Sequence, residues 1–204
     1  MDFSVWLGLL TICSLGAMTP GLSLAMVVRH TLGGGRRNGI ICSWAHSLGI
    51  GAYALVTLLG LAVILKEAPM VFNSIAIAGA LYLIYIGLQA LRSKGGVSGN
   101  LAEGKSTSAL TAARDGLAIS IFNPKIMLFF LALFSQFVLA ADSMAAKSII
   151  VLTPLVVDGV WYSIVAMALS HSAVLPKLRQ NAALIDKLSG VVLILLSIRV
   201  LVTL

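Results

Sequence analysis

Charged side chains are scarce in this chain. They make up 10% of its 204 residues, whereas 59% of the residues are hydrophobic. Soluble domains carry about 25% charged residues, so the composition excludes an ordinary soluble enzyme or binding domain. Acidic residues are the rarest charged group, with seven Asp and Glu against fourteen Lys and Arg, which leaves a net charge of +7.

Cysteine is also scarce, because the chain contains only Cys13 and Cys42. Both lie inside apolar segments, whereas disulfide frameworks belong to small secreted domains, so we interpret them as small buried hydrophobic residues. The start, Met1-Asp2-Phe3, lacks the positive region of a signal peptide. The first apolar segment is therefore expected to be permanent. The three histidines are scattered, which predicts no metal site.

Long apolar segments are what the chain has in place of charge. Roughly 20 apolar residues span the hydrocarbon core of a bilayer, and six segments meet this condition: 3–28, 39–65, 68–91, 116–141, 148–170 and 188–204. The longest hydrophilic stretch, 92–115, is a Gly/Ser-rich connector that is too short to hold a core. We expect an all-α integral membrane protein with six transmembrane helices in a single domain, 1–204, surrounded by lipid.

Most basic residues lie in alternate loops between these segments. Ten of the fourteen are in three such loops: Arg29, Arg36, Arg37, Arg92, Lys94, Lys105, Arg114, Lys177, Arg179 and Lys187. The opposite loops hold Lys66 and Lys147, each with an acidic residue nearby. By the positive-inside rule the basic loops are cytoplasmic. This placement explains the net charge without nucleic acid as a partner. Glycines 33–35 are expected to form a flexible turn in the first basic loop.

Two prolines divide the chain into similar halves. Pro20 and Pro124 are 104 residues apart, and each lies in the first of three apolar segments. Because three is odd, the second group would insert upside-down, as in the inverted repeats of secondary transporters. We therefore expect two inverted three-helix repeats, about 1–92 and 114–204, whose first helices are broken by proline.

The breaks predict a binding site. Proline removes a backbone donor and clashes with the preceding turn, and freed backbone groups are tolerated in a membrane only when they are buried in protein or line a cavity. An amino-acid carboxylate would lie at the helix starts after the breaks. The expected substrate-binding residues are Pro20, Gly21, Ser23, Asn123, Pro124 and Lys125. The alternative is a pair of kinks that only shape packing.

Two charged residues fall about ten residues into apolar segments, Lys125 in the fourth and Asp158 in the fifth. A charge at the middle of a bilayer costs about 2.5–3.5 kcal/mol on insertion scales and usually faces a cavity or a partner. One interpretation is a structural Lys125–Asp158 ion pair. The other is that Asp158 carries the coupling proton or holds the substrate ammonium group.

Four segments carry a family resemblance. They are "TPGLSLAMVVRHTLGGGRRNGI" (19–40), "AGALYLIYIGLQALRS" (78–93), "IFNPKIMLFFLALFSQF" (121–137) and "DKLSGVVLILLSIRVL" (186–201). In order and spacing they resemble the LysE/RhtB family of bacterial amino-acid exporters. The resemblance implies a multi-pass antiporter of the bacterial cytoplasmic (inner) membrane. It would export an amino acid or derivative in exchange for protons and without a cofactor. Small residues at 47–52 permit close helix packing and leave a homo-oligomer open.

The chain departs from the family pattern at several positions. The T-P-G-P motif reads T-P-G-L with Leu22, and the Asn after it is Ser23. The Gly-Asp pair of many members is Gly49-Ile50 here, which favours a neutral over a dibasic substrate. His46 lies one turn before Ile50 on the same helix face. Because imidazole titrates near neutral pH, His46 is a second candidate for proton coupling. The alternative is a packing histidine bonded to backbone.

Two other functions stay open. Export of another small solute or of a metal ion is the main alternative, since the second-segment acid is absent. A membrane thiol–disulfide electron carrier is a remote one, because it needs a cysteine in each repeat and both cysteines lie in the first. No nucleophile or metal constellation indicates an enzyme.

Overall fold

The chain folds entirely into helices in the parts that the structure, a computed structural model, describes: residues 1–93, 108–169 and 174–203. The elements are α1 (Phe3–Met18), α2 (Leu22–Glu67), α3 (Pro69–Leu91), α5 (Ala109–Phe122), α6 (Pro124–Leu133), a 3-10 helix η1 (Ser135–Ala140), α7 (Met144–Ala168), α8 (Val174–Gln180) and α9 (Ala182–Thr203). The expected all-α class is confirmed. Most of the expected connector 92–115, residues 94–107, lies outside the described residues.

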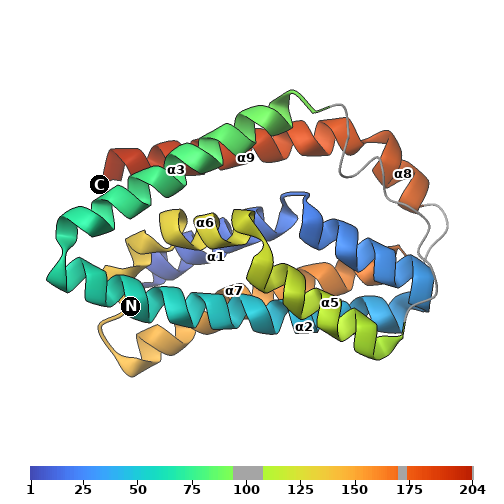
Figure 1. The fold of residues 1–204 in the computed structure, drawn as a ribbon, viewed down its shortest axis with the longest axis horizontal. Helices are drawn as coiled ribbons and strands as arrows, with labels where there is room; N and C mark the ends of the chain where they lie inside the picture. The colour runs from blue at the N-terminus through green and yellow to red at the C-terminus, as the bar shows by residue number, and fades with distance from the viewer. Residues whose placement is uncertain (94–107, 170–173, 204) are drawn as a thin grey trace.

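The helices form three layers in the view of Figure 1. Helices α3 and α9 run side by side along one edge, and α2, α5 and α7 pack together along the opposite edge. The broken segments, α1 and α6, lie between these layers, where α1 contacts α7 and α6 contacts α3. Both helix breaks are therefore held in the interior of the protein.

Both expected proline breaks are present. Helix α1 ends at Met18 and α2 begins at Leu22, so the first apolar segment is interrupted at Thr19–Gly21. Helices α5 and α6 meet at Asn123 with a bend of 51°. Because proline has no N–H to donate to the preceding turn, the helix before each break ends ahead of its proline. The next helix begins at Leu22, two residues after Pro20, in the first break, and at Pro124 itself in the second.

Gly35 divides α2 into two arms, 22–34 and 36–67. Its φ of 75° lies in the left-handed region, which glycine adopts without steric penalty. The flexible turn expected at 33–35 is therefore a single kinked residue, Gly35. The loop expected between the first two apolar segments is otherwise helical. Gly33 and Gly34, just before this kink, are part of the helix.

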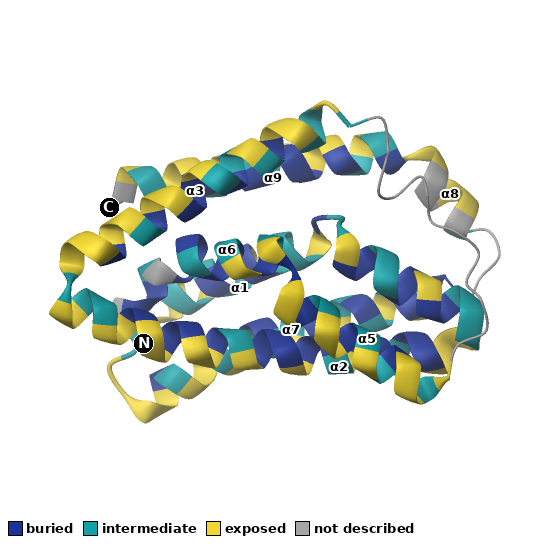
Figure 2. Cartoon of the chain, viewed as in Figure 1, coloured by how far each residue is buried: buried dark blue, intermediate teal, exposed yellow. Residues whose placement is uncertain are grey.

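Many large apolar side chains on the helices are exposed. Figure 2 draws the exposed positions of the chain in yellow. Val56, for example, is 70% exposed. Soluble proteins rarely expose broad apolar patches, so these faces fit lipid. By length and composition, three described helices are able to cross a membrane: α2, α3 and α7. A fourth span follows if the bent pair α5–α6 is counted as one, and α1 is a shorter apolar helix. The chain is thus a multi-pass membrane protein, while six spans in two inverted repeats remain a prediction.

Candidate functional site

The two helix breaks meet inside the protein. The Lys125 ammonium group donates to the Thr19 carbonyl oxygen at 3.0 Å. A Cβ placed on Gly21 would lie 3.6 Å from the same Lys125 nitrogen. Pro20 and Pro124 line one cavity that encloses about 1100 Å³ of space between atoms, part of it open to the surroundings. The two breaks, about half the chain apart in sequence, are thus adjacent in the structure.

Asn123 joins the two breaks and caps α6. Its Oδ1 accepts from the Lys125 backbone N–H at 3.1 Å, and its Nδ2 donates to the Ser23 hydroxyl at 3.4 Å. An asparagine at this position satisfies one of the unpaired N–H groups of a helix start. This accounts for its presence in an apolar segment.

The two helix starts are not equivalent, although a carboxylate site was expected at both. At the start of α6, Pro124 has no N–H and Asn123 occupies the N–H of Lys125. At the start of α2 the capping residue is Gly21, and no side chain caps the helix. The first N–H groups of a helix lack intrahelical partners and carry partial positive charge. The start of α2, with Lys125 beside it, is therefore the better anion site.

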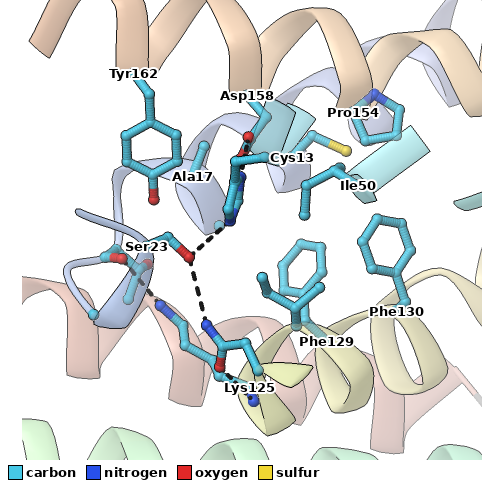
Figure 3. A pocket seen from close by; sticks show the side chains of 16 residues that line it. Cys13, Ala17, Ser23, Ile50, Lys125, Phe129, Phe130, Pro154, Asp158 and Tyr162 are labelled. Atoms are coloured by element: carbon cyan, nitrogen blue, oxygen red, sulfur yellow. Dashed lines mark hydrogen bonds and ion pairs between the residues drawn. The ribbon is translucent and has the colours of Figure 1, made fainter. Parts of the chain in front are cut away.

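His46 and Asp158 form a buried pair on the other side of Ser23. His46 Nδ1 lies 2.7 Å from Asp158 Oδ2, and His46 Nε2 lies 2.9 Å from the Ser23 hydroxyl. All three side chains line one cavity, at which Figure 3 shows Ser23 and Asp158. His46 is 1% exposed and Asp158 is 6% exposed.

This pairing corrects two alternatives considered from sequence. Among the described residues, Asp158 pairs with His46, while Lys125 is bonded to the Thr19 carbonyl. The Lys125–Asp158 ion pair, one of the two interpretations of these charges, is therefore not formed. His46 is bonded to side chains rather than to a neighbouring backbone. Both outcomes follow from packing, because the second arm of α2 lies against α7 and brings His46 to Asp158.

Tyr162 completes the polar end of the cavity. It lies one turn after Asp158 on α7, and its ring meets the His46 ring edge-on with centroids 5.5 Å apart. Its hydroxyl end points toward Ser23 in Figure 3. Sequence reasoning did not assign Tyr162 to the site, although its i+4 spacing from Asp158 placed both on one helix face.

The cavity around this network encloses about 560 Å³ of space between atoms, some of it open to the surroundings. Its polar end is lined by Ser23, His46, Asn123, Lys125, Asp158 and Tyr162. Its apolar end is lined by Cys13, Ile50, Ile126, Phe129 and Phe130. Sequence patterns missed the two phenylalanines, because aromatic residues in an apolar helix are normally read as packing or lipid-facing residues.

A second cavity lies against the first. Four residues line both: Thr19, Gly21, Asn123 and Lys125. The second cavity continues along α3 and α9 to Ser93 and Asp186, whose side chains are bonded at 2.7 Å. Together the two cavities are lined by all eight residues that the sequence predicts for substrate binding and proton coupling. Their roles stay predictions.

Comparisons with known proteins show the family of this chain. A family model described as "LysE type translocator" matches residues 14–204. The homoserine/homoserine lactone efflux protein of Salmonella typhimurium is 27% identical over 78% of this chain and 77% of its own length. An uncharacterized membrane protein of Bacillus subtilis is 23% identical over 92% and 94%. The leucine efflux protein of Salmonella choleraesuis is 26% identical over 59% and 57%. No solved structure matches the chain.

The family match covers more than nine tenths of the chain and includes both helix breaks, the His46–Asp158 pair and every residue that lines the two cavities except Cys13. It confirms the resemblance drawn from the four sequence segments. Members of this family are transporters and not enzymes. The chain belongs to the LysE-type translocator family.

Proposed function

We propose that the protein exports an amino acid or a derivative of one from the cytoplasm in exchange for protons. The family and the relatives named as homoserine and leucine efflux proteins support amino-acid export. The single observation that carries the coupling to protons is the buried His46–Asp158 pair, 2.7 Å apart in a cavity that also holds Lys125. The proposed setting is the bacterial inner membrane, with the basic loops on the cytoplasmic side.

The substrate carboxylate binds between Lys125 and the start of α2. The uncapped N–H groups after Gly21 and the ammonium group of Lys125 both favour an anion. In the structure the Lys125 ammonium group donates to the Thr19 carbonyl. A bound carboxylate is a stronger acceptor than a carbonyl, so it draws Lys125 away from Thr19.

The substrate ammonium group binds at Asp158, and the same carboxylate accepts the coupling proton. When the His46–Asp158 pair is protonated, it has no net negative charge with which to hold an ammonium group. When it is deprotonated, it attracts the ammonium group. Because proton and substrate compete for one carboxylate, each occupant is released by the other. This competition is the physical basis of exchange.

Two cavities with a shared wall support alternating access. With the basic loops in the cytoplasm, the second cavity opens toward that side, because it reaches Ser93 and Asp186 beside those loops. The contact of Lys125 with the Thr19 carbonyl closes the wall between this entrance and the His46–Asp158 pair. Opening and closing of this contact moves the substrate from one cavity to the other.

The inverted repeat provides the symmetry for this movement. Pro20 and Pro124 line one cavity and are 104 residues apart. Gly87 on α3 and Gly190 on α9 also pack against each other, at nearly the same offset along the chain. Equivalent helices of the two proposed repeats thus meet at equivalent points, as expected for an approximate twofold axis.

Efflux from preloaded membrane vesicles tests the proposal. Labelled amino acid is loaded inside right-side-out vesicles, and its release is followed with the outside acidified. Export should accelerate in the acid gradient and fall when a protonophore collapses it. Amino-acid export that is indifferent to the gradient would reject the coupling, and the absence of any amino-acid export would reject the function.

Export of another small solute stays the second candidate, because the same cavity would accept other small amphipathic molecules. For a metal ion, the described residues contain no group of three or more His, Cys, Asp or Glu side chains placed to hold one. Counterflow of unlabelled amines, organic acids and divalent cations against the labelled amino acid separates these candidates in the same vesicles.

A further inference from the structure

The cavity around His46 and Asp158 has one polar and one apolar end, and this division limits what it binds. We infer that the exported compound is an amino acid with a single ammonium group and an apolar side chain, selected by Ile50, Phe129 and Phe130. The inference rests on the proposed function, since it names the substrate class of that site.

The apolar end is well packed. Ile50 is 6% exposed, Phe129 is 9% exposed and Phe130 is 2% exposed. The Phe129 and Phe130 rings meet edge-on at 5.7 Å, and Phe130 also stacks on Tyr53 at 6.0 Å. Neighbouring rings thus hold the wall in place. An apolar side chain entering this end leaves water for an apolar surface, which is favourable in proportion to the area buried.

The charges at the polar end suffice for one zwitterion. Lys125 and the start of α2 accept one carboxylate. Asp158 is the one carboxylate among the described residues that line this cavity, and it is already bonded to His46. A second ammonium group, at the tip of a dibasic side chain, would be directed to Ile50 and the phenylalanines. An ion without a partner in apolar surroundings is strongly unfavourable.

A polar uncharged side chain is disfavoured for a related reason. The apolar end, lined by Cys13, Ile50, Ile126, Phe129 and Phe130, presents no strong side-chain acceptor or donor. A serine or asparagine side chain placed there would give up its hydrogen bonds to water without replacing them. The apolar end of the cavity therefore discriminates against substrates with polar side chains.

Ile50 has the most direct control over charge selection. It lies one helical turn after His46 on α2, so its side chain stands between the polar and apolar ends of the cavity. Replacing Ile50 by aspartate would place a second carboxylate within the cavity. The side chain of lysine or ornithine would then find a partner where the wild-type protein offers a hydrocarbon surface.

Competition for efflux tests the inference. Vesicles carrying the wild-type protein export labelled leucine, and unlabelled leucine, methionine, serine and lysine compete for the site. Leucine and methionine should compete about tenfold better than serine or lysine, the range that one apolar contact supplies.

Ile50→Asp should reduce leucine export and raise the preference for lysine about tenfold. Ile50→Asn, the matched control, removes the apolar surface without a charge, so it should reduce leucine export without a gain for lysine.

The outcomes separate this inference from the proposed function. Wild-type vesicles that export lysine or serine as readily as leucine would overturn the substrate class and leave amino-acid export intact. If no amino acid is exported, the proposed function itself fails. Should Ile50→Asp not insert, Phe129→Leu provides a second variant. This change keeps the wall apolar but enlarges the cavity, so the export of phenylalanine should rise relative to that of leucine. An unchanged order of substrate preference would contradict a selecting role for that wall.

Discussion

The hydroxyl group of Ser23 lies at the centre of the buried polar network. It is 2.9 Å from His46 Nε2 and accepts from Asn123 Nδ2 at 3.4 Å. Through these contacts it connects both helix breaks with the second arm of α2. Each partner is nearly inaccessible to water. The loss of one group would therefore leave another without a hydrogen-bond partner, which costs about 1–3 kcal/mol of stability. The network is therefore a structural requirement as well as a proposed route for a proton.

Replacement of Asp158 by asparagine tests the proton-carrying role. The amide keeps the shape and can still bond His46, so the variant should insert normally. It has no proton to exchange near neutral pH, so gradient-driven export should fall to background in the vesicle assay. Asp142→Asn changes an exposed acid outside the cavity and should leave export unchanged. Wild-type acceleration by the gradient in Asp158→Asn would remove this residue from the mechanism.

A double-mutant cycle tests which residue is the partner of Asp158. Breaking a buried ion pair by removing one member costs about 3–5 kcal/mol, because the other charge is left without a partner. His46→Ala combined with Asp158→Ala, which removes the bond, should therefore destabilise less than the two single changes added together. Thermal unfolding in detergent measures each variant.

The matching cycle pairs Lys125→Ala with Asp158→Ala. Because Lys125 donates to the Thr19 carbonyl and not to Asp158, these two effects should add within about 0.5 kcal/mol. Strong coupling between Lys125 and Asp158, with none between His46 and Asp158, would contradict the observed pairing.

Lys125 should matter far more than a lysine at the membrane surface. Lys125→Ala removes the donor to the Thr19 carbonyl and the positive charge proposed for the substrate carboxylate, so efflux should drop at least about tenfold, as expected for one charge-assisted hydrogen bond. Lys66→Ala removes an exposed lysine 3.7 Å from Glu67, and surface pairs contribute about 0–1 kcal/mol. Equal effects of the two changes on efflux would count against a binding role for Lys125.

At the scale of elements, one close helix contact depends on small residues. Helices α3 and α9 approach closely through glycine: a Cβ on Gly87 would lie 2.8 Å from the Gly190 carbonyl oxygen, and one on Gly190 would lie 2.5 Å from that of Gly87. Small residues allow this approach in membranes, where dispersion contacts replace the hydrophobic effect. The layer of α3 and α9 therefore depends on these two residues.

Gly87→Ala tests this contact. The added methyl group meets backbone rather than a flexible side chain, so α3 and α9 must separate, at about 1–3 kcal/mol for an overpacked contact. The melting temperature in detergent should fall. Gly60→Ala is the matched control, because a Cβ on Gly60 has no neighbour within 4 Å and alanine is the better helix former. A Gly87→Ala protein as stable as Gly60→Ala would show that the helices are not in this register.

At the scale of the whole molecule, the open question is orientation in the bilayer. The proposed direction of transport depends on the basic loops lying in the cytoplasm. Both endogenous cysteines are buried and free, so a background of Cys13→Ala and Cys42→Ala, which keeps the cavity wall apolar, should retain export. Loss of all activity in that background would instead indicate thiol chemistry.

Single cysteines in this background report the topology. Arg37→Cys, at an exposed position between the first two expected spans, should react with an impermeant reagent only from the cytoplasmic side. Lys66→Cys, at the opposite end of α2, should react only from outside. Reversed labelling would overturn the orientation and reverse the roles proposed for the two cavities.

Much of the fold follows from rules that act within one segment. Bilayer thickness and apolar composition locate the membrane helices, and the missing N–H of proline predicts the breaks at Pro20 and Pro124. Short motifs were enough to indicate the family, which the match over residues 14–204 confirms. Lys125 and Asp158 were recognised as site candidates because each is a charged residue in an apolar segment. A buried charge is costly and needs a cavity or a partner, and its position in an apolar segment is visible in the sequence alone.

Only the tertiary structure decided the partners of those charges. His46 and Asp158 are 112 positions apart in sequence, and Lys125 and Thr19 are 106 apart, so no local periodicity relates them. The same holds for Phe129 and Phe130, whose apolar character is indistinguishable in sequence from that of a lipid-facing helix. Whether a membrane side chain meets lipid, another helix or a cavity depends on how the helices pack. That packing is determined by contacts between segments far apart in the chain, such as the one between Gly87 and Gly190.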